Sequence, residues 1–400
     1  MKKDLRNIFI VLVLFGFGEG IFYNFLELWM QDNALSVKTV STIFSLCSLI
    51  AVLFIFLFSN YIRKHHLKKF VSILLFLKAV LLLLLFLLNH TGQSFWIKFF
   101  IMLERAIDTE ITVCIYPLMS LVKMDDRTYG KKDIVYNFVY YIALLVSGLA
   151  LGKSLGFIKF DYNTYAIISS IVIFIAYYVL NRMKLAVKKE EDDDKDEIIV
   201  YELAKKISKD KPSNYYLAFL IFGQISYYTI TGLTMTFLTD VFHYDPTLAS
   251  NIRVYLGIAA AIFAMIALNF LTFKNDYVNL GIKYITRIIF YTIAIIVMGD
   301  MWFLIAFAVP RFLATSYSHI TCAPYINRFK GKYQLAFCNL REMIIYLGDF
   351  IGYWLCGLCY KNGIWHNFLW ALIFQIITVV FAYIALYYRN KEKYDRKQLG

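Results

Sequence analysis

The sequence predicts an all-α integral membrane protein with twelve transmembrane helices, arranged as two pseudo-symmetric six-helix bundles. Three observations support this fold class. The 400 residues are 60% hydrophobic and only 17% charged, whereas about a quarter of the residues in a soluble domain are charged. One long polar stretch, from Arg182 to Lys211, interrupts the apolar chain near its middle. On each side, the chain divides into six apolar segments of about 20 residues, the length that crosses a bilayer.

The predicted spans follow one another with short polar connections. They cover 8–30, 38–59, 70–89, 95–119, 133–156 and 164–181, and then 214–239, 247–271, 281–299, 301–325, 333–359 and 365–388. Residues 1–181 are therefore expected to form an N-terminal bundle and residues 213–400 a C-terminal bundle. Residues 182–212 are expected to form a charged cytoplasmic linker between them.

The distribution of basic residues predicts the orientation in the membrane. Thirty Lys and Arg residues lie in the termini, the linker and alternate connections, and only four lie in the opposite connections (Lys38, Lys153, Lys159 and Lys361). Connections rich in basic residues stay in the cytoplasm. We therefore expect a multi-pass protein of the plasma membrane with both termini in the cytoplasm. This pattern accounts for the net charge of +13 without a nucleic-acid partner.

The cysteines do not predict a metal site. All six lie in or beside predicted spans, and the one CxxC pair, Cys356 and Cys359, has no second pair and no nearby histidine. Small thiols within membrane helices are the better interpretation. We expect no metal and no cofactor.

An internal repeat supports the division into two bundles. The fifth and eleventh spans carry small residues at every fourth position, 200 residues apart, and such stripes let two helices approach closely. These residues are Gly148, Gly152 and Gly156 in the first copy and Gly348, Gly352 and Cys356 in the second. The fourth and tenth spans also correspond, because each has an arginine followed by a proline. These pairs are Arg105 with Pro117 and Arg311 with Pro324.

Over essentially its whole length the chain resembles the major facilitator superfamily of secondary transporters, through the six-plus-six topology, the inside termini and the long central loop. The connection SNYIRKHHLKK keeps the basic character of that family's loop between helices two and three, but Arg63 stands in place of its aspartate. The fifth span is similar to half of the antiporter motif G-x-x-x-G-P-x-x-G-G. Here Lys153 replaces the proline and Phe157 the last glycine. The resemblance implies a major facilitator fold.

Charged residues inside the first and fourth spans are candidates for proton coupling, because an ionised group in a membrane helix needs a functional or structural partner. Glu19 and Glu27 lie eight positions apart, which is about 12 Å along a helix, so both can border one cavity. In the fourth span, Arg105 and Asp108 are neighbours on the helix surface, with Glu110 close by. The resemblance implies a role in proton movement for an arginine at the place of Arg105. We expect Lys78 and Lys98, by contrast, to extend their charges to the membrane surface.

The second half and the first span supply candidates for lining a substrate cavity. The interpretation favours a cavity or coupling role over a fixed interhelical ion pair, but both remain open. The predicted cavity residues are Tyr23, Arg253, Arg311, Arg341, Glu342, Tyr346 and Asp349.

These observations predict a secondary active transporter that works by alternating access and exports small amphipathic or lipophilic compounds in exchange for protons. The alternatives are proton-coupled uptake of a sugar, nucleoside or small peptide, and a lipid flippase of the same fold. No Ser/His/Asp constellation, metal-ligand spacing or phosphate-binding loop predicts an enzyme, and no filter-like repeat predicts a channel. The expected partners are a small-molecule substrate, protons and the bilayer, and the chain is expected to act as a monomer.

Overall fold

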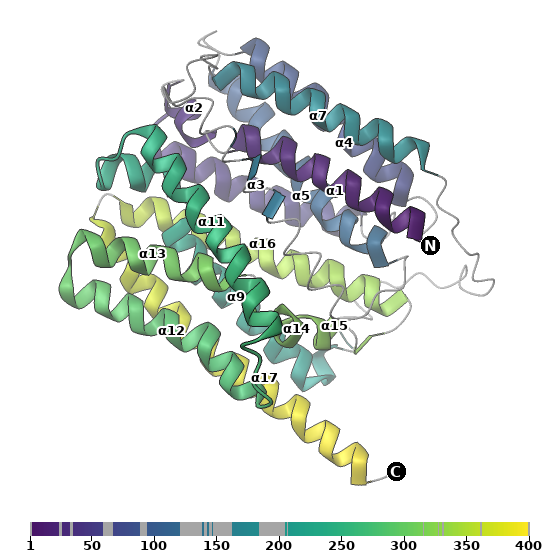
Figure 1. Ribbon diagram of the computed structural model, residues 1–400, viewed down its shortest axis with the longest axis vertical. Coiled ribbons are helices and arrows are strands. Elements are labelled where there is room, and N and C mark those ends of the chain that lie inside the picture. Colours follow the sequence, from purple (N-terminus) through teal and green to yellow (C-terminus); the bar gives the residue numbers. More distant parts are fainter. Residues whose placement is uncertain are drawn as a thin grey trace. The chain divides into compact units, whose positions relative to one another are not determined.

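A computed structural model shows the chain as a set of helices (Figure 1). The structure describes residues 2–23, 26–32, 35–58, 67–88, 94–120, 138–139, 142–143, 146, 162–183, 205, 207–314, 316–326, 328–329, 332–360 and 362–398. The chain divides into two compact units. Unit 1 comprises Met1–Asp196 and Leu233–Ala261, and unit 2 comprises Glu197–Gly232 and Ile262–Gly400.

Within its described residues, unit 1 is built mainly from five long helices. They are α1 (Lys2–Tyr23), α3 (Val37–Phe58), α4 (Leu67–Leu88), α5 (Ser94–Ser120) and α7 (Tyr162–Arg182). Helix α7 packs against α1 and α4, and α5 packs against α3 and α4. The short helix α2 (Leu26–Asp32) follows α1 and contacts α3 and α10 (Thr234–Thr236). The π-helix η2 (Phe237–Val241) and the first part of α11 (Pro246–Asn269) complete this unit.

Unit 2 is arranged around α9 (Lys211–Thr231), which packs against both α16 (Lys332–Tyr360) and α17 (Ile364–Gln398). Helix α12 (Asp276–Val297) packs against α17 and α13 (Asp300–Ala314), and two short helices follow, α14 (Ser318–Thr321) and α15 (Ala323–Ile326). The core of this unit is aromatic. The rings of Tyr216 and Tyr325 stack with centroids 4.3 Å apart, and both side chains are buried.

Polar caps mark where two of these helices begin. The Asp210 carboxylate accepts a hydrogen bond from the backbone N–H of Ser213 at 3.2 Å, and Pro212 lies in the first turn of α9. Both features are typical of a helix N-terminus. The side chain of Asn275 accepts a hydrogen bond from the N–H of Tyr277 at 2.9 Å and starts α12 in the same way.

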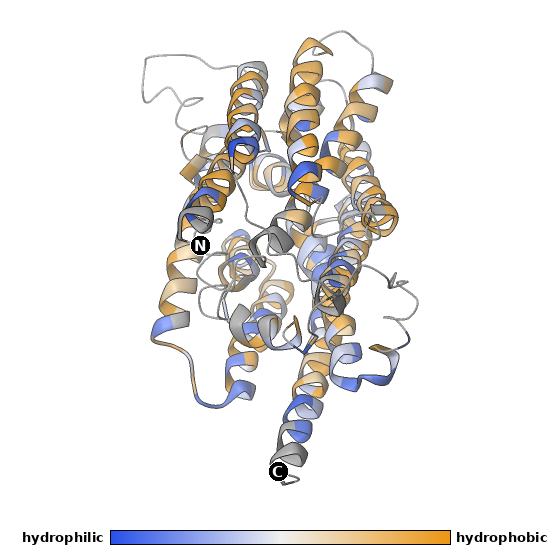
Figure 2. Ribbon diagram, turned by 90° about the vertical axis from the view of Figure 1, so that its right-hand side faces the viewer, coloured by the Kyte–Doolittle hydropathy of each residue, from blue (hydrophilic) through white to orange (hydrophobic). Residues whose placement is uncertain are grey.

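Nine segments among the described residues are long and apolar enough to cross a membrane. Figure 2 shows hydrophobic residues along most of the helices, with hydrophilic ones at connections, near the C-terminus and in bands within several helices. The predicted fourth and tenth spans do not meet this criterion, since α5 carries several charged residues and α13 has only 15 residues. Most of the predicted fifth span and most of the linker lie outside the described residues.

Three predicted spans do not form single continuous helices. The first divides into α1 and α2, and the tenth ends its main helix at Ala314, before α14 and α15. The seventh is interrupted after Thr231, because Leu233 has φ −120° and ψ 59°, outside the helical region. The chain resumes in α10 and continues as η2. Turns of this kind inside membrane segments need partners for their backbone groups.

The small-residue stripe of α16 is confirmed as a close helix contact. A Cβ atom built on Gly348 would come within 2.7 Å of both the Ile221 carbonyl oxygen and the Gln224 Cβ atom of α9. One built on Gly352 would come within 2.7 Å of the Tyr228 Cβ atom. These glycines therefore let the two backbones approach to a distance that a larger residue would prevent. The corresponding stripe at residues 148–156 lies outside the described residues.

Candidate functional site

Five ionisable side chains meet in the interior of unit 1, and we call them the ion-pair cluster. Glu19 comes from α1, Lys78 from α4, and Glu104, Arg105 and Asp108 from α5. The Lys78 Nζ atom lies 2.5 Å from Glu104 Oε1 and 2.8 Å from Asp108 Oδ1, and it also pairs with Glu19. One lysine thus joins three carboxylates from two helices.

Arg105 forms the second positive centre of the cluster. Its Nη1 atom lies 3.2 Å from Glu19 Oε2 and 3.1 Å from Asp108 Oδ2. The Arg105 side chain is 17% exposed, whereas the side chain of Lys78 is 0% exposed and those of Glu19 and Asp108 are each 8% exposed. Arg105 is therefore the most exposed side chain of the cluster.

Lys78 corrects a sequence prediction. We expected its charge to reach the membrane surface, but the side chain is fully buried and its amine is the centre of the cluster. The sequence feature that could have predicted a buried Lys78 is its position near the middle of the apolar segment LKKFVSILLFLKAVLLLLLFLL. A lysine at that depth has to fold its stem along the helix to reach water, so a buried partner is an equally good explanation.

Two adjacent serines of α7 position the helices that carry the cluster. The Ser169 hydroxyl donates to the backbone carbonyl of Gly18 at 2.6 Å, and the Ser170 hydroxyl donates to that of Ala79 at 2.7 Å. Gly18 precedes Glu19 in the sequence, and Ala79 follows Lys78. A Cβ atom on Gly18 would lie 2.7 Å from the Ile173 side chain, so this glycine permits the close approach of α1 to α7.

The charges in the cluster do not balance. With every group ionised, three carboxylates face two cations, so these five side chains by themselves carry one net negative charge. One Glu104 oxygen is buried without a hydrogen-bond partner among the described residues. Buried charges are stable when they are paired and hydrogen-bonded. The cluster can therefore take up one proton and become neutral.

An aromatic ring adjoins the cluster on the side of Arg105. The guanidinium carbon of Arg105 lies 4.2 Å from the centroid of the Tyr23 ring, and that of Arg253, from α11, lies 5.7 Å from the same centroid. Both distances are within the range of cation–π attraction. The structure thus brings the predicted coupling residue Arg105 and the predicted cavity residue Arg253 to one ring, that of the predicted cavity residue Tyr23.

Glu27 has a different environment from Glu19. Its Oε2 atom accepts hydrogen bonds from the backbone N–H groups of Met235 at 3.0 Å and Thr236 at 3.2 Å, and from the Thr236 hydroxyl at 3.3 Å. The Gln31 amide donates to the same hydroxyl at 2.9 Å. Glu27 therefore satisfies backbone groups where the seventh predicted span is interrupted. The first-span acids do not lie together in one cluster.

Glu110 also lies outside the ion-pair cluster. Its side chain is fully buried, and its Oε1 atom accepts a long hydrogen bond of 3.8 Å from the Cys114 thiol. Its other oxygen has no hydrogen-bond partner among the described residues. Glu110 is thus a separate buried carboxyl on the same helix as Asp108.

Apart from Arg253, which belongs to unit 1, the predicted residues of the second half lie in unit 2. Arg341 donates from Nε to the Tyr216 hydroxyl at 2.9 Å and pairs with Glu342 next to it. Asp349 is buried on the same helix, with one oxygen lacking a hydrogen-bond partner among the described residues. The Arg311 guanidinium lies 4.8 Å from the centroid of the Phe307 ring in α13. Tyr346, on α16, is partly exposed.

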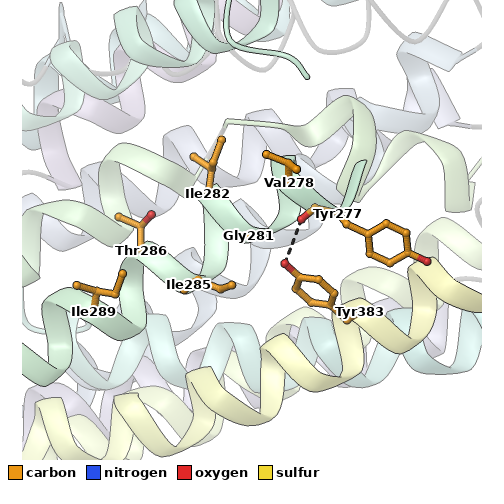
Figure 3. Close-up of a pocket in the computed structure, with 8 residues that line it drawn as sticks. All are labelled: Tyr277, Val278, Gly281, Ile282, Ile285, Thr286, Ile289 and Tyr383. Carbon is orange, nitrogen blue, oxygen red and sulfur yellow. Dashed lines mark hydrogen bonds between the residues drawn. The ribbon is translucent and has the colours of Figure 1, made fainter. Parts of the chain in front are cut away.

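An apolar groove of about 500 Å³ lies between α12 and α17 (Figure 3). Tyr277, Gly281, Ile285 and Tyr383 are among its lining residues, and the Tyr383 hydroxyl donates to the Tyr277 carbonyl at 3.0 Å. None of its lining residues is charged. This surface suits contact with lipid chains, and its chemistry differs from that of the ion-pair cluster.

The described residues contain no group of three or more His, Cys, Asp or Glu side chains placed to hold a metal ion. The three carboxylates of the cluster instead surround the Lys78 amine. These carboxylates can bind and release protons, and they can form ion pairs with cations.

The comparisons with known proteins identify the family. The model of the Major Facilitator Superfamily matches residues 8–326. A search of curated proteins finds no match. Among solved structures, the chain is similar to the nucleoside transporter NupG, with a TM-score of 0.66, 14% sequence identity and coverage of 96% of this chain and 98% of that chain.

Two further structures share the fold. The transporter FucP, in its outward conformation, has a TM-score of 0.71 and 12% identity, with coverage of 95% of this chain and 98% of that chain. The human organic anion transporter MFSD10 (TETRAN) has a TM-score of 0.66 and 9% identity, with coverage of 96% and 99%. These likenesses confirm the predicted major facilitator fold. Because the family match extends over most of the sequence, this protein is a multi-pass membrane transporter rather than an enzyme, and the chain belongs to the major facilitator superfamily.

Proposed function

We propose that the protein is a proton-coupled secondary transporter that carries a small solute by alternating access. The observation that carries this proposal is the charge imbalance of the ion-pair cluster, in which three carboxylates share two cations. A buried charge without compensation is unfavourable by several kcal/mol. Binding one proton removes that cost, and releasing it restores the cost.

The contacts of Arg105 support a route from proton binding to conformational change. Arg105 joins α5 to Glu19 on α1 at 3.2 Å and also pairs with Asp108 at 3.1 Å. A proton on Glu19 weakens the first pair and leaves Arg105 with Asp108. A transporter has at least two conformations, and a ligand shifts their populations by its difference in affinity for them. We propose that the protonated cluster favours one of the two conformations.

Two candidate functions, export and uptake, differ in the direction of transport. Export of amphipathic compounds is supported by the antiporter-like glycines of the fifth predicted span, which lie outside the described residues. Uptake is supported by the cationic, partly exposed end of the cluster at Arg105, which suits entry of a solute together with a proton. The structural neighbours include a nucleoside transporter, so a nucleoside or sugar-like solute is one candidate for uptake. For a flippase of this fold, the partly exposed Arg105 would be a candidate contact for a lipid headgroup.

We also propose the setting in which this transport occurs. Both termini lie in the cytoplasm and the protein resides in the plasma membrane, as supported by the thirty-to-four distribution of basic residues across the connections. We propose in addition that the protein acts as a monomer.

A flux assay in liposomes tests proton coupling. The full chain is reconstituted with a pH-sensitive dye inside, and ethidium, uridine, L-fucose and succinate are added in turn under imposed pH gradients. We expect one class of solute to move protons with it, and Glu19→Gln and Glu104→Gln to abolish accumulation driven by the gradient while solute exchange continues. Accumulation by the wild type that does not depend on the gradient would reject the proposal.

The variant Glu110→Gln tests whether the transported proton binds in the ion-pair cluster or at Glu110. This substitution removes a buried carboxyl from α5 without touching the ion-pair cluster. We expect gradient-driven accumulation to persist in this variant. Loss of coupling in Glu110→Gln, with coupling retained in Glu19→Gln, would assign the proton to Glu110 instead.

A further inference from the structure

Asp349 is a buried carboxyl in unit 2, apart from the ion-pair cluster. It lies on α16 and is 5% exposed. Its Oδ1 atom has no hydrogen-bond partner, and no cation pairs with it, among the residues that the structure describes. Asp108 in unit 1 is buried to a similar degree but pairs with both Lys78 and Arg105. The described surroundings of Asp349 thus contain nothing that would stabilise its charged form.

The one ionisable group of the described residues that acts on Asp349 is another carboxylate, that of Glu342. Glu342 precedes Asp349 by seven positions and lies on the same face of α16. Its own charge is compensated, because it pairs with Arg341. Repulsion from Glu342 therefore adds to burial in favouring the neutral, protonated form of Asp349.

The helices that pack against α16 add no other charge at this position within the described part of the chain. These helices are α9, α15 and α17. On α9, the uncharged Gln224 lies against Gly348, the residue before Asp349. Helix α15 contains no charged residue, and Arg389, the buried arginine of α17, pairs with Asp276. Burial without a cation is thus a property of the packing around Asp349.

A polar stripe on α16 leads from partly exposed residues to Asp349. Glu342, Tyr346 and Asp349 follow one another at spacings of four and three positions, which places them along one face of the helix. The Glu342 side chain is 14% exposed and Tyr346 is partly exposed, whereas Asp349 is buried. The stripe is about 10 Å long, and the tyrosine hydroxyl in its middle can both donate and accept a hydrogen bond. It offers a proton a polar path to Asp349.

We propose that Asp349 is a second proton-binding site of this transporter, whose proton moves in each cycle in addition to the one bound by the ion-pair cluster. This inference rests on the proposed function, because it adds a proton to the same cycle. In the described conformation Asp349 is a neutral carboxylic acid. When water reaches it, the O–H bond breaks and the proton leaves a carboxylate, which the next proton neutralises. A structural role alone would be served equally by an asparagine, since no cation requires the charge.

Infrared spectroscopy of the full chain in detergent tests whether Asp349 holds a proton. A protonated carboxyl has a C=O stretching band that an ionised carboxylate lacks. Aspartate labelled with heavy carbon shifts the bands of aspartates alone, so the buried glutamates do not contribute to the shift. We expect a shifted band at about pH 7, although an ordinary aspartate, with a pKa of about 3.9, is ionised there. Asp108, which has two cationic partners, should not contribute to it.

Two variants assign this band. Asp349→Asn keeps the size of the side chain and should remove the band. Asp300→Asn is the matched control, because Asp300 is an exposed aspartate of the same unit. We expect the control to leave the band unchanged. The labelled wild-type protein gives the first answer without any substitution, so the test does not depend on the folding of a variant.

The number of protons per solute tests whether this proton is transported. Liposomes are held at zero membrane potential under a series of pH gradients, with whichever of ethidium, uridine, L-fucose and succinate accumulates in the flux assay. Each transported proton changes the equilibrium ratio of solute across the membrane by about tenfold per pH unit. We expect about hundredfold per pH unit for the wild type and for Asp300→Asn, and about tenfold for Asp349→Asn.

The possible results separate this inference from the proposed function. Absence of the shifted band, or its persistence in Asp349→Asn, would overturn the proton on Asp349 and leave coupling by the cluster standing. A band that Asp349→Asn removes, with the same solute ratio in this variant and the wild type, would make Asp349 a static acid and overturn its transport role. A band that Asp349→Asn removes, with no gradient-driven accumulation in the wild type, would reject the proposed function and confirm the proton on Asp349 alone.

Discussion

Glu27 binds the backbone and the hydroxyl of Thr236, 209 residues further along the sequence, at 3.2 Å and 3.3 Å. The same oxygen accepts the N–H of Met235 at 3.0 Å. These N–H groups lie just beyond the point where the helical run of α9 stops. A membrane offers them no water as a substitute partner. The carboxylate of Glu27 is thus what allows the seventh segment to be interrupted there.

We predict that Glu27→Ala destabilises the protein more than Glu27→Gln does. Alanine leaves two buried N–H groups and a hydroxyl without this acceptor, which costs about 2–5 kcal/mol. Glutamine keeps an oxygen in place and loses only the contribution of the charge, about 1 kcal/mol. Thermal unfolding followed with a thiol-reactive dye measures both, because the buried free cysteines report exposure. Equal losses in both variants would contradict this reading of the contact.

We predict that Lys78→Met lowers the free energy of unfolding by about 3–5 kcal/mol, because it leaves buried carboxylates without their main cation. Methionine has a similar length and fills the same space. The same thermal unfolding assay measures the loss.

A second substitution that restores the charge balance of the cluster should recover part of the stability that Lys78→Met loses. Lys78→Met with Glu104→Gln restores the net charge of the wild-type cluster, since it removes one cation and one anion. We expect the double variant to regain about half of the lost stability or more. A double variant as unstable as the sum of the two single ones would show that Lys78 and Glu104 act independently.

We predict that Gly352→Ala destabilises unit 2 by about 1–3 kcal/mol, since the added Cβ would meet the Tyr228 Cβ atom at 2.7 Å. Gly223→Ala, on the partner helix α9, is the matched control. There the added Cβ would meet Thr378 Cγ2 at an ordinary 3.4 Å. We expect the control to be neutral or stabilising by about 0.5–1 kcal/mol, because alanine favours the helix. Differential thermal unfolding of the two variants in the same detergent decides between these outcomes.

We predict that Arg328→Ala costs less than Asp210→Ala. Arg328 pairs with Asp210 and, at 2.8 Å, with Glu392, but these side chains are 19–37% exposed, so the pairs contribute about 1 kcal/mol or less. Asp210 also caps α9 through the N–H of Ser213, which is worth about another 1 kcal/mol. The midpoint of thermal unfolding of each variant gives the order. A larger loss for Arg328→Ala would show that the pair is stronger than its exposure implies.

The lengths of the apolar segments predicted most of the helices, and the small-residue spacing predicted a close helix contact along α16, whose partner α9 only the structure identifies. The neighbouring charges of α5 were also predictable, because residues three and four positions apart share a helix face. The place of Lys78 was not. The same side chain can reach either the membrane surface or a buried carboxylate, and only the packing of α4 against α5 selects between them.

The interruption of the seventh span could not be predicted from the sequence either, because it also depends on tertiary contacts. The sequence stays apolar through Gly232 and Leu233, so hydropathy gives no sign of a break. The partner that stabilises it, Glu27, lies 208 residues before Met235 and looks like a second proton-coupling acid when only the first span is considered. Long-range contacts of this kind are set by the tertiary fold.

The paired serines of α7 have a mechanical consequence. Ser169 donates a hydrogen bond to the backbone of α1, and Ser170 donates one to the backbone of α4. Each accepting carbonyl is one position from a charged residue of the cluster, Glu19 or Lys78. Separating α7 from α1 or from α4 would therefore break one of these hydrogen bonds. We expect rearrangement of the cluster to fall on Arg105 rather than on Glu19 or Lys78, because neither hydrogen bond involves α5.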